Sequence, residues 1–381
     1  MSKSFQTWIG LVRPRRCYSD VKRPLNILFF GSDQFSVHSL KALHKLKEED
    51  PHLIRTLQVV TRPAKKCGRN LSVTRDVPIA KYSTHLGLPP VIECDSQQDM
   101  LGPVRDKLME GQFNMIIAVS FGKLISKKLL AEVPYTLNVH PSLLPRYKGS
   151  SPIQYTLLNQ DAVTGVSIQT LHPEKFDCGR IIAQTPPLRT SDLLLRDGLQ
   201  IHEPSYMSES AVPPKVAKLM DVLGDIGSEL LVRVIREGAY KAQNIFSPPF
   251  AESFAPKITT DLRQIQWNST TSQQALSKIG ALGPVYSFKA AQRKSQEPLL
   301  KRVIFHKLKP CTDTCGTPIG QRPGSFYYDD IRKCILVRFV DGTVLQCPEI
   351  QFEGSKIEGP EQFSKSLRKR CGRCAQEAFF L

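Results

Sequence analysis

The feature that most constrains the fold is a buried apolar run followed at once by a turn and an amphipathic helix. Leu25–Phe30 has the length and composition of a buried strand, and Gly31 opens the turn that follows it. From Phe35 to about Lys47, apolar residues recur at helical spacing. Leu57–Val60 is a second strand-like run. A strand, a helix and a strand in this order predict an α/β fold with a doubly wound, mostly parallel sheet.

The same rhythm continues towards the middle of the chain. Met115–Val119 and Thr136–His140 are strand-like, and helical stretches are expected near Pro78–His85 and Asp99–Met109. The first turn holds a single glycine and lacks the G-x-G-x-x-G pattern that lets a backbone approach a pyrophosphate. We therefore expect a Rossmann-like sheet but not an NAD-type dehydrogenase. Ligands of such sheets bind beyond the carboxyl ends of the strands, where His140 stands.

The second half of the chain has a different pattern. A long amphipathic helix is expected over Val216–Glu237, and the Pro-rich stretch Phe246–Thr260 is typical of a linker. From Val285 onward short alternating strands recur, and Asp341-Gly342 is a hairpin signal between two of them. This pattern predicts a small β-barrel. The expected division is a catalytic domain at 25–240, a linker at 241–275 and a barrel domain at 276–381.

The charge of the chain favours a polyanionic partner. Its 381 residues carry 52 Lys and Arg against 35 Asp and Glu, a net charge of +17. Residues 289–381 alone hold seventeen basic and ten acidic residues, a net of +7, including a basic tail at 364–373. Such an excess is typical of nucleic-acid binding. The alternative is that part of it belongs to a removable leader or reflects a general bias of matrix proteins.

The first 24 residues have the composition of a mitochondrial transit peptide. Six cations stand there against one acid, Asp20, among serines and apolar residues. The segment around Arg16-Cys17-Tyr18-Ser19 resembles a matrix-peptidase cleavage site that would leave Ser19 as the new N-terminus. A flexible basic arm is the alternative. The prediction is therefore a protein of the mitochondrial matrix.

Neither a membrane span nor a metal site is expected. No run reaches the ~18 consecutive apolar residues that a membrane helix needs. Ten cysteines are present at irregular spacing, and the pairs Cys311/Cys315 and Cys371/Cys374 lie too far apart to form a zinc-finger pattern. Reduced thiols are the expectation.

The richest stretch for chemistry surrounds His140. Asn138 and His140 are two residues apart at a strand end, so their side chains share one side of the strand. An amide can stabilise an oxyanion and an imidazole can move a proton, which suits acyl transfer. Asp177, in Phe176-Asp177-Cys178-Gly179, could orient His140. An Asn-x-His pair alone is weak evidence, and Asp177 could equally be a turn-capping residue.

Together these motifs resemble those of the folate-dependent formyltransferases. The family pattern Asn-Val-His-x-Ser-Leu-Leu-Pro-Arg-x-x-Gly is matched from Asn138 to Gly149, and its downstream Asp-x-Gly by Asp177 and Gly179. Phe254-Ala255-Pro256-Lys257 ahead of Trp267 is similar to the block that leads into the OB-like domain of the methionyl-tRNA formyltransferases. The resemblance implies a formyltransferase fold followed by an OB-like barrel, with 10-formyltetrahydrofolate as donor and initiator Met-tRNA as acceptor.

The resemblance also assigns roles to residues. It implies Asn138, His140 and Asp177 as the catalytic trio, and it implies contacts with the folate from Phe121, Gly122, Ser142, Leu143, Leu144 and Pro145. The implied tRNA contacts are Arg62, Lys65, Lys66, Arg69 and Arg146. A solvated basic loop is the alternative for residues 62–69. The segment 189–212 fits the family poorly.

Three other functions stay open on the sequence. A formyltransferase acting on a small amine, or a hydrolase of formyl-folate acting on water, would share the trio Asn138, His140 and Asp177. Neither explains the basic barrel or the leader. A non-catalytic RNA-binding protein would have no physical need for all three residues of the trio.

Overall fold

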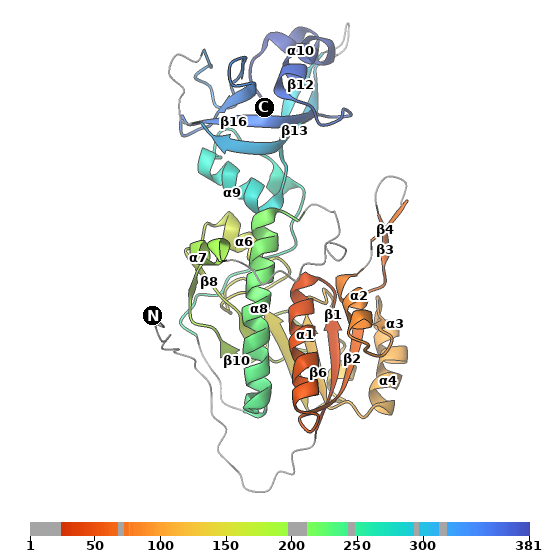
Figure 1. The fold of residues 1–381 in the computed structure, drawn as a ribbon. Coiled ribbons are helices and arrows are strands. Elements are labelled where there is room, and N and C mark those ends of the chain that lie inside the picture. Colours follow the sequence, from red (N-terminus) through yellow and green to blue (C-terminus); the bar gives the residue numbers. More distant parts are fainter. Residues whose placement is uncertain are drawn as a thin grey trace. The chain divides into compact units, whose positions relative to one another are not determined.

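The computed structural model describes residues 24–67, 72–75, 77–196, 212–242, 248–292, 297–311 and 318–381, which form two compact units (Figure 1). The first unit ends at Lys257, and the second comprises Ile258–Leu381 with the short segments Leu157–Gln160 and Ala211–Val216. The expected leader lies outside the described residues, as do Arg69 and most of the irregular stretch 189–212.

A seven-stranded sheet forms the centre of the first unit, in the order β10-β9-β7-β6-β1-β2-β5. Its strands β5, β2, β1, β6 and β7 are parallel, whereas β9 and β10 are antiparallel additions beside β7. The strands are β1 (Leu25–Gly31), β2 (Ile54–Thr61), β5 (Ile92–Glu93), β6 (Met115–Val119), β7 (Tyr135–His140), β9 (Ser167–Gln169) and β10 (Ile181–Gln184). The predicted mostly parallel sheet is thereby confirmed.

Helices cover both faces of this sheet. On one face, α1 (Gln34–Glu49) and α8 (Pro214–Arg236) run side by side, joined by a 2.9 Å bond between His38 Nε2 and Asp221 Oδ1 (Figure 1). On the other face, Leu28 and Phe30 pack against the helical stretch formed by α3 (Gln97–Asp99), the π-helical turn η2 (Met100–Val104) and α4 (Arg105–Glu110). The sheet is thus doubly wound.

Short elements complete the first unit. A small hairpin, β3 with β4, leaves the sheet after β2. The remaining elements are β3 (Lys65–Cys67), β4 (Val73–Arg75), α2 (Pro78–His85), α5 (Lys127–Leu130), α6 (Pro152–Leu158), β8 (Val163–Thr164), β11 (Leu188–Arg189), α7 (Thr190–Leu195) and η3 (Ala239–Lys241). No helix of the described residues is long and apolar enough to cross a membrane.

The second unit is built on a five-stranded antiparallel sheet in the order β12-β13-β16-β15-β14. Its elements are η4 (Asp261–Arg263), α9 (Ser272–Leu282), β12 (Val285–Ala291), β13 (Leu299–Pro310), β14 (Phe326–Asp329), β15 (Cys334–Arg338), β16 (Val344–Phe352), α10 (Pro360–Cys371) and η5 (Arg373–Gln376). The basic tail is therefore mostly helix α10, which packs into the core through Phe363 and Leu367.

The last residues of the sequence join the two edges of this sheet. Leu381 exchanges backbone hydrogen bonds with Phe288 of β12, at 2.7 and 3.2 Å. On the other side, Phe380 N–H donates to Gly324 O and Phe326 N–H of β14 donates to Ala378 O, both at 2.9 Å. Residues 378–381 thus close the sheet into a barrel, which confirms the predicted OB-like architecture.

Candidate active site

The carboxyl ends of β6 and β7 form the floor of a cavity of about 510 Å³. Ala118 and Asn138 are paired in register, so their side chains lie on one face of the sheet, and His140 follows two residues later on the same face. All three residues line the cavity. The carboxyl end of β7 therefore carries both the amide and the imidazole on one face of the sheet, as the sequence predicts.

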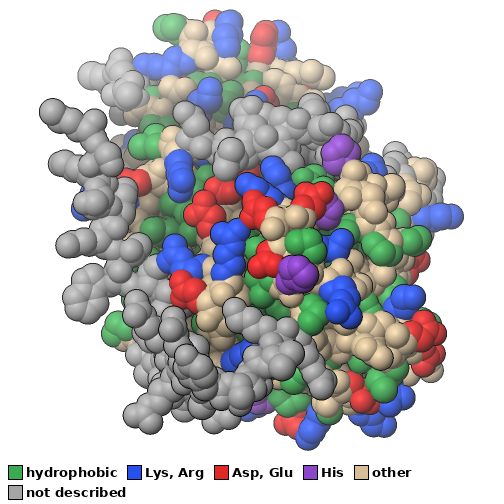
Figure 2. Space-filling model, turned by 60° about the horizontal axis from the view of Figure 1, so that its bottom comes forward, with side chains coloured by type: hydrophobic (Ala, Val, Ile, Leu, Met, Phe, Trp, Pro, Cys, Tyr) green, Lys and Arg blue, Asp and Glu red, His purple; other side chains and the backbone are tan. Residues whose placement is uncertain are grey.

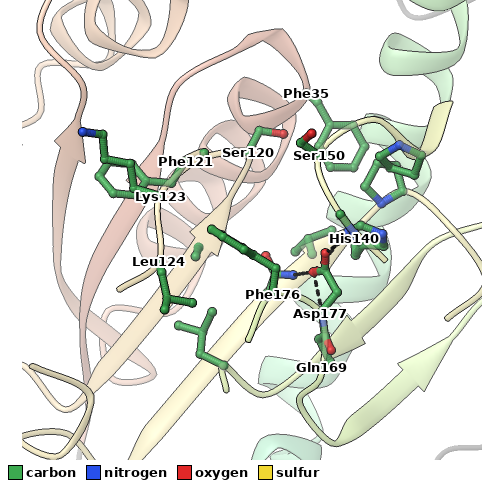
Figure 3. A pocket seen from close by; sticks show the side chains of 18 of the residues that line it. Phe35, Ser120, Phe121, Lys123, Leu124, His140, Ser150, Gln169, Phe176 and Asp177 are labelled. Atoms are coloured by element: carbon green, nitrogen blue, oxygen red, sulfur yellow. Dashed lines mark hydrogen bonds and ion pairs between the residues drawn. The ribbon is translucent and has the colours of Figure 1, made fainter. Parts of the chain in front are cut away.

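The Asp177 carboxylate contacts several other residues of the site (Figure 3). Its Oδ1 accepts from Asn138 Nδ2 at 3.1 Å and from Gln169 Nε2 at 2.9 Å, and lies 3.4 Å from His140 Nδ1. Its Oδ2 accepts from the backbone N–H of Gly149 at 2.8 Å. Asp177 has a φ of +53°, a conformation that non-glycine residues adopt only where the surroundings enforce it. The turn thus presents a carboxylate that is only 8% exposed.

His140 is held from two sides. Its Nδ1 faces Asp177, and its Nε2 lies 2.9 Å from the carbonyl oxygen of Tyr147. Both ring nitrogens therefore face acceptors, so either can hold a proton with a hydrogen-bond partner. Asn138, His140 and Asp177 are brought together as the sequence predicts. Gln169 and the Gly149 N–H were not foreseen, because β9 pairs with β7 in a way that no local pattern reveals.

The predicted folate residues fall into two groups. Phe121 and Gly122 line the cavity, together with Leu124, Ile125 and Phe176. Figure 3 shows Phe121, Leu124 and Phe176. The other group, Ser142, Leu143, Leu144 and Pro145, is not among the residues that line it. Ser142 and Leu144 are about 1% exposed, and Ser142 Oγ donates to Arg146 O at 2.7 Å. These four residues belong to the loop that follows β7, and they do not face the cavity.

An acid that the sequence analysis did not single out also lines the cavity. Asp33 caps the first turn of α1, where its carboxylate accepts from Ser36 N–H at 3.1 Å. Burial raises the pKa of Asp33 to about 6, and the hydrogen bond from Ser36 N–H opposes this rise. The signal was present in the turn Gly31-Ser32-Asp33, since Asp is a preferred helix N-cap.

The predicted tRNA-contacting cations differ in their surroundings. Arg62 Nε and Lys123 Nζ each lie 3.1 Å from Asp95 Oδ1, and these partners, Lys123 foremost, hold the pKa of that carboxyl below its usual value. Arg146 pairs with Asp161 at 2.8 Å. Lys65 and Lys66 lie on strand β3. On the face shown in Figure 2, basic side chains are interspersed with acidic ones.

The cysteines form no evident metal site in the part of the chain that the structure describes. Within those residues, no group of three or more His, Cys, Asp or Glu side chains is arranged to hold a metal ion. Burial raises the pKa of the Cys94 and Cys334 thiols to about 11, so both are protonated near neutral pH.

Comparison with known proteins agrees with this geometry. The formyl transferase family model matches residues 25–190, which contain the sheet, the trio and the cavity floor. An N-formyltransferase from Helicobacter canadensis, crystallised with folinic acid and dTDP-3-aminofucose, aligns with a TM-score of 0.51 at 14% identity, covering 85% of this chain and 98% of that one. A HypX variant from Aquifex aeolicus aligns with a TM-score of 0.51 at 15% identity, covering 91% and 48%. Fold and family model together assign residues 25–190 to a formyl transferase domain.

Two relatives show to which family of formyltransferases the chain belongs. The mitochondrial methionyl-tRNA formyltransferase of Saccharomyces cerevisiae is 44% identical over 376 residues, which cover 94% of this chain and 93% of that protein. Its Homo sapiens counterpart is 30% identical over 329 residues, covering 85% and 73%. The chain belongs to the methionyl-tRNA formyltransferase family.

Proposed function

We propose that the chain transfers the formyl group of 10-formyltetrahydrofolate to the amino group of initiator Met-tRNA, for translation initiation in mitochondria. The observation that carries this proposal is the joint placement of Asn138, His140 and Asp177 at the floor of one open cavity. Family membership names the acceptor class, and the 44% identical relative is mitochondrial.

The cavity fits a folate in size and lining. Its volume of about 510 Å³ lies within the range of small-molecule sites. Phe121, Leu124, Ile125 and Phe176 offer apolar surface for a flat ring system. Gly122, at φ +76°, lies in the same wall, and Arg62 Nη1 is 3.8 Å from the position that a Cβ would take there. We propose that the residues of this wall contact the folate, and that the loop Ser142–Pro145 supports the floor of the cavity.

The residues of the trio act in concert. When bound, 10-formyltetrahydrofolate supplies the formyl carbon that the neutral methionyl amine attacks. One N–H of the Asn138 amide is engaged by Asp177, and the other, which has no hydrogen-bond partner among the described residues, can donate to the oxyanion that develops. His140 moves the proton from the amine towards the leaving nitrogen, so the products are the formylated amine and tetrahydrofolate. Asp177 fixes the orientation of both partners.

For the tRNA we propose contacts from the basic loop at 62–69 and from the second unit. Lys65, Lys66 and Arg69 would contact phosphates. Arg62 and Arg146, which are paired with Asp95 and Asp161, would add further phosphate contacts. The barrel domain at 276–381, with the cations of α10, would add a second basic surface. Residues 1–24 are the proposed transit peptide and 241–275 the proposed linker.

A formylation assay on the full-length chain tests this function. Labelled 10-formyltetrahydrofolate is offered with Met-tRNA or with free methionine, and Asp177→Asn is run in parallel. Label on Met-tRNA alone, reduced at least a hundredfold in the variant, is the expected result. Label on methionine, or release of formate to water without transfer, would instead identify a small-amine transferase or a hydrolase.

A further inference from the structure

A short extended segment, Glu252–Pro256, is hydrogen-bonded along the loop that carries the active-site contacts. It pairs with residues 145–151, and Lys148 and Phe254 form an isolated parallel bridge. Four backbone bonds join the two: Ser253 N to Pro145 O (3.2 Å), Lys148 N to Ser253 O (2.9 Å), Ala255 N to Lys148 O (2.7 Å) and Ser151 N to Ala255 O (3.1 Å). A salt bridge of 2.8 Å between Lys148 and Glu252 reinforces the pairing. We call residues 252–256 the bracing segment.

The bracing segment reaches His140 through one residue. Ser253 Oγ accepts the backbone N–H of Tyr147 at 3.0 Å, and the carbonyl of the same Tyr147 lies 2.9 Å from His140 Nε2. Tyr147 has a φ of +58°, which a bulky side chain adopts only when its surroundings enforce it. The Ser253 hydroxyl is one of the groups that enforce it, since it satisfies the N–H that this conformation presents.

The same segment reaches Asp177 through Gly149. The Gly149 N–H donates to Asp177 Oδ2 at 2.8 Å, and the Ala255 carbonyl lies where a side chain of residue 149 would project. A Cβ at this position would lie 2.6 Å from Ala255 O, and Gly149 has a φ of +122°. The glycine of the motif is therefore required by the close approach of the bracing segment. Both partners of the His140–Asp177 pair thus depend on the same segment.

We propose that Ser253 is a positioning residue for formyl transfer, acting through the Tyr147 carbonyl on His140. This inference rests on the proposed function and adds a residue outside the matched family region 25–190. Because catalysis requires the imidazole within a few tenths of an ångström of its productive place, loosening Tyr147 lowers turnover rather than affinity. No group of Ser253 touches the substrates in this scheme.

The test compares Ser253→Ala with Ser253→Thr, which keeps a hydroxyl at the same position. Ser228→Ala is the matched control, since Ser228 is a serine of α8 that is 6% exposed, bonds to Asp225 O at 2.7 Å and does not line the cavity. We expect Ser253→Ala to lower kcat about tenfold or more, with the KM of either substrate changed less than about twofold. Ser253→Thr should restore most of the turnover.

A second readout does not depend on the substrates. Ring-nitrogen NMR shifts of ¹⁵N-histidine-labelled protein, with His140 assigned through His140→Ala, should move in Ser253→Ala and stay in place in Ser228→Ala. Unchanged kcat and unmoved His140 resonances in Ser253→Ala, or an equal fall of kcat in Ser228→Ala, would overturn the proposal. Failure of the proposed function would appear differently, as absence of transfer to Met-tRNA by the unmodified chain.

Discussion

Phe380 offers a sharp test of how the barrel is closed. Its side chain is 1% exposed and stacks on Phe326, with ring centroids 4.4 Å apart, while also meeting Phe305 at 5.1 Å and Trp267 at 6.1 Å. Replacing a buried Phe by Ala removes these contacts and leaves a cavity, which costs about 3–5 kcal/mol. Phe380→Ala should therefore destabilise the second unit by an amount of this order.

The neighbouring Phe379 is the control. It is only half-buried and lies against Arg322, whose guanidinium carbon is 4.0 Å from its ring centroid. An exposed cation–π contact contributes about 0.5–1 kcal/mol, so Phe379→Ala should cost about 1 kcal/mol. Residues 379 and 380 alternate across one extended segment, and the comparison therefore isolates the face that points into the core.

The chain carries its own probe for this measurement. Trp267 is one of two tryptophans, and it stacks on Phe380 with the ring planes 20° apart. Urea unfolding followed by Trp267 fluorescence, in protein with Trp8 replaced by Phe, reports the free energy of unfolding of the second unit. Equal costs for the two variants, or a cost below about 1 kcal/mol for Phe380→Ala, would refute the view that residues 378–381 are part of the core.

Three further outcomes are expected. Gly149→Ala should lower kcat about tenfold or more, as measured in the formylation assay, because its Cβ would lie 2.6 Å from Ala255 O; near-full turnover would contradict the bracing geometry. Asp33→Asn should raise the free energy of unfolding at pH 7.5 by up to about 3 kcal/mol, because burial raises the pKa of Asp33 to about 6 and the ionised carboxylate present at pH 7.5 therefore destabilises the fold. That gain should shrink in urea titrations as the pH falls through 6 towards 4, and a gain that stayed constant with pH would count against burial as the cause. Lys66→Ala should weaken Met-tRNA binding and reduce the slope of log Kd against log salt by about one in fluorescence titrations; an unchanged slope would remove Lys66 from the phosphate contacts.

Much of the first unit could be predicted from sequence because its strands are buried and locally patterned. Met115–Val119 and Pro78–His85 are found with the predicted bounds, and β7 begins one residue earlier than expected, at Tyr135. Apolar runs of strand length and a Pro at the start of a helix are local signals. The methionyl-tRNA formyltransferase family, expected from the motifs, and the mitochondrial localisation, expected from the first 24 residues, are confirmed by the comparisons.

Other elements escaped because their signals are not local. Ser167–Gln169 is a strand of three residues that owes its conformation to pairing with β7. Helix α9, Ser272–Leu282, begins within the stretch expected to be linker, although Thr271 and Gln274 form a capping box there. The site followed the same rule, since Asn138 and His140 are close in sequence, whereas Ser253 meets Tyr147 across 106 positions.

The bracing segment bears on how this protein can be divided into modules. The family pattern ends at residue 190, and the long helix α8 ends at Arg236, so either point looks like a natural place to separate a catalytic piece. Glu252–Pro256 lies beyond both, at the last residues before the second unit begins at Ile258. Recombination that exchanges the barrel for another binding domain preserves the active site only if the crossover falls after Pro256. Residues 252–256 must therefore stay with the catalytic unit when the second unit is exchanged.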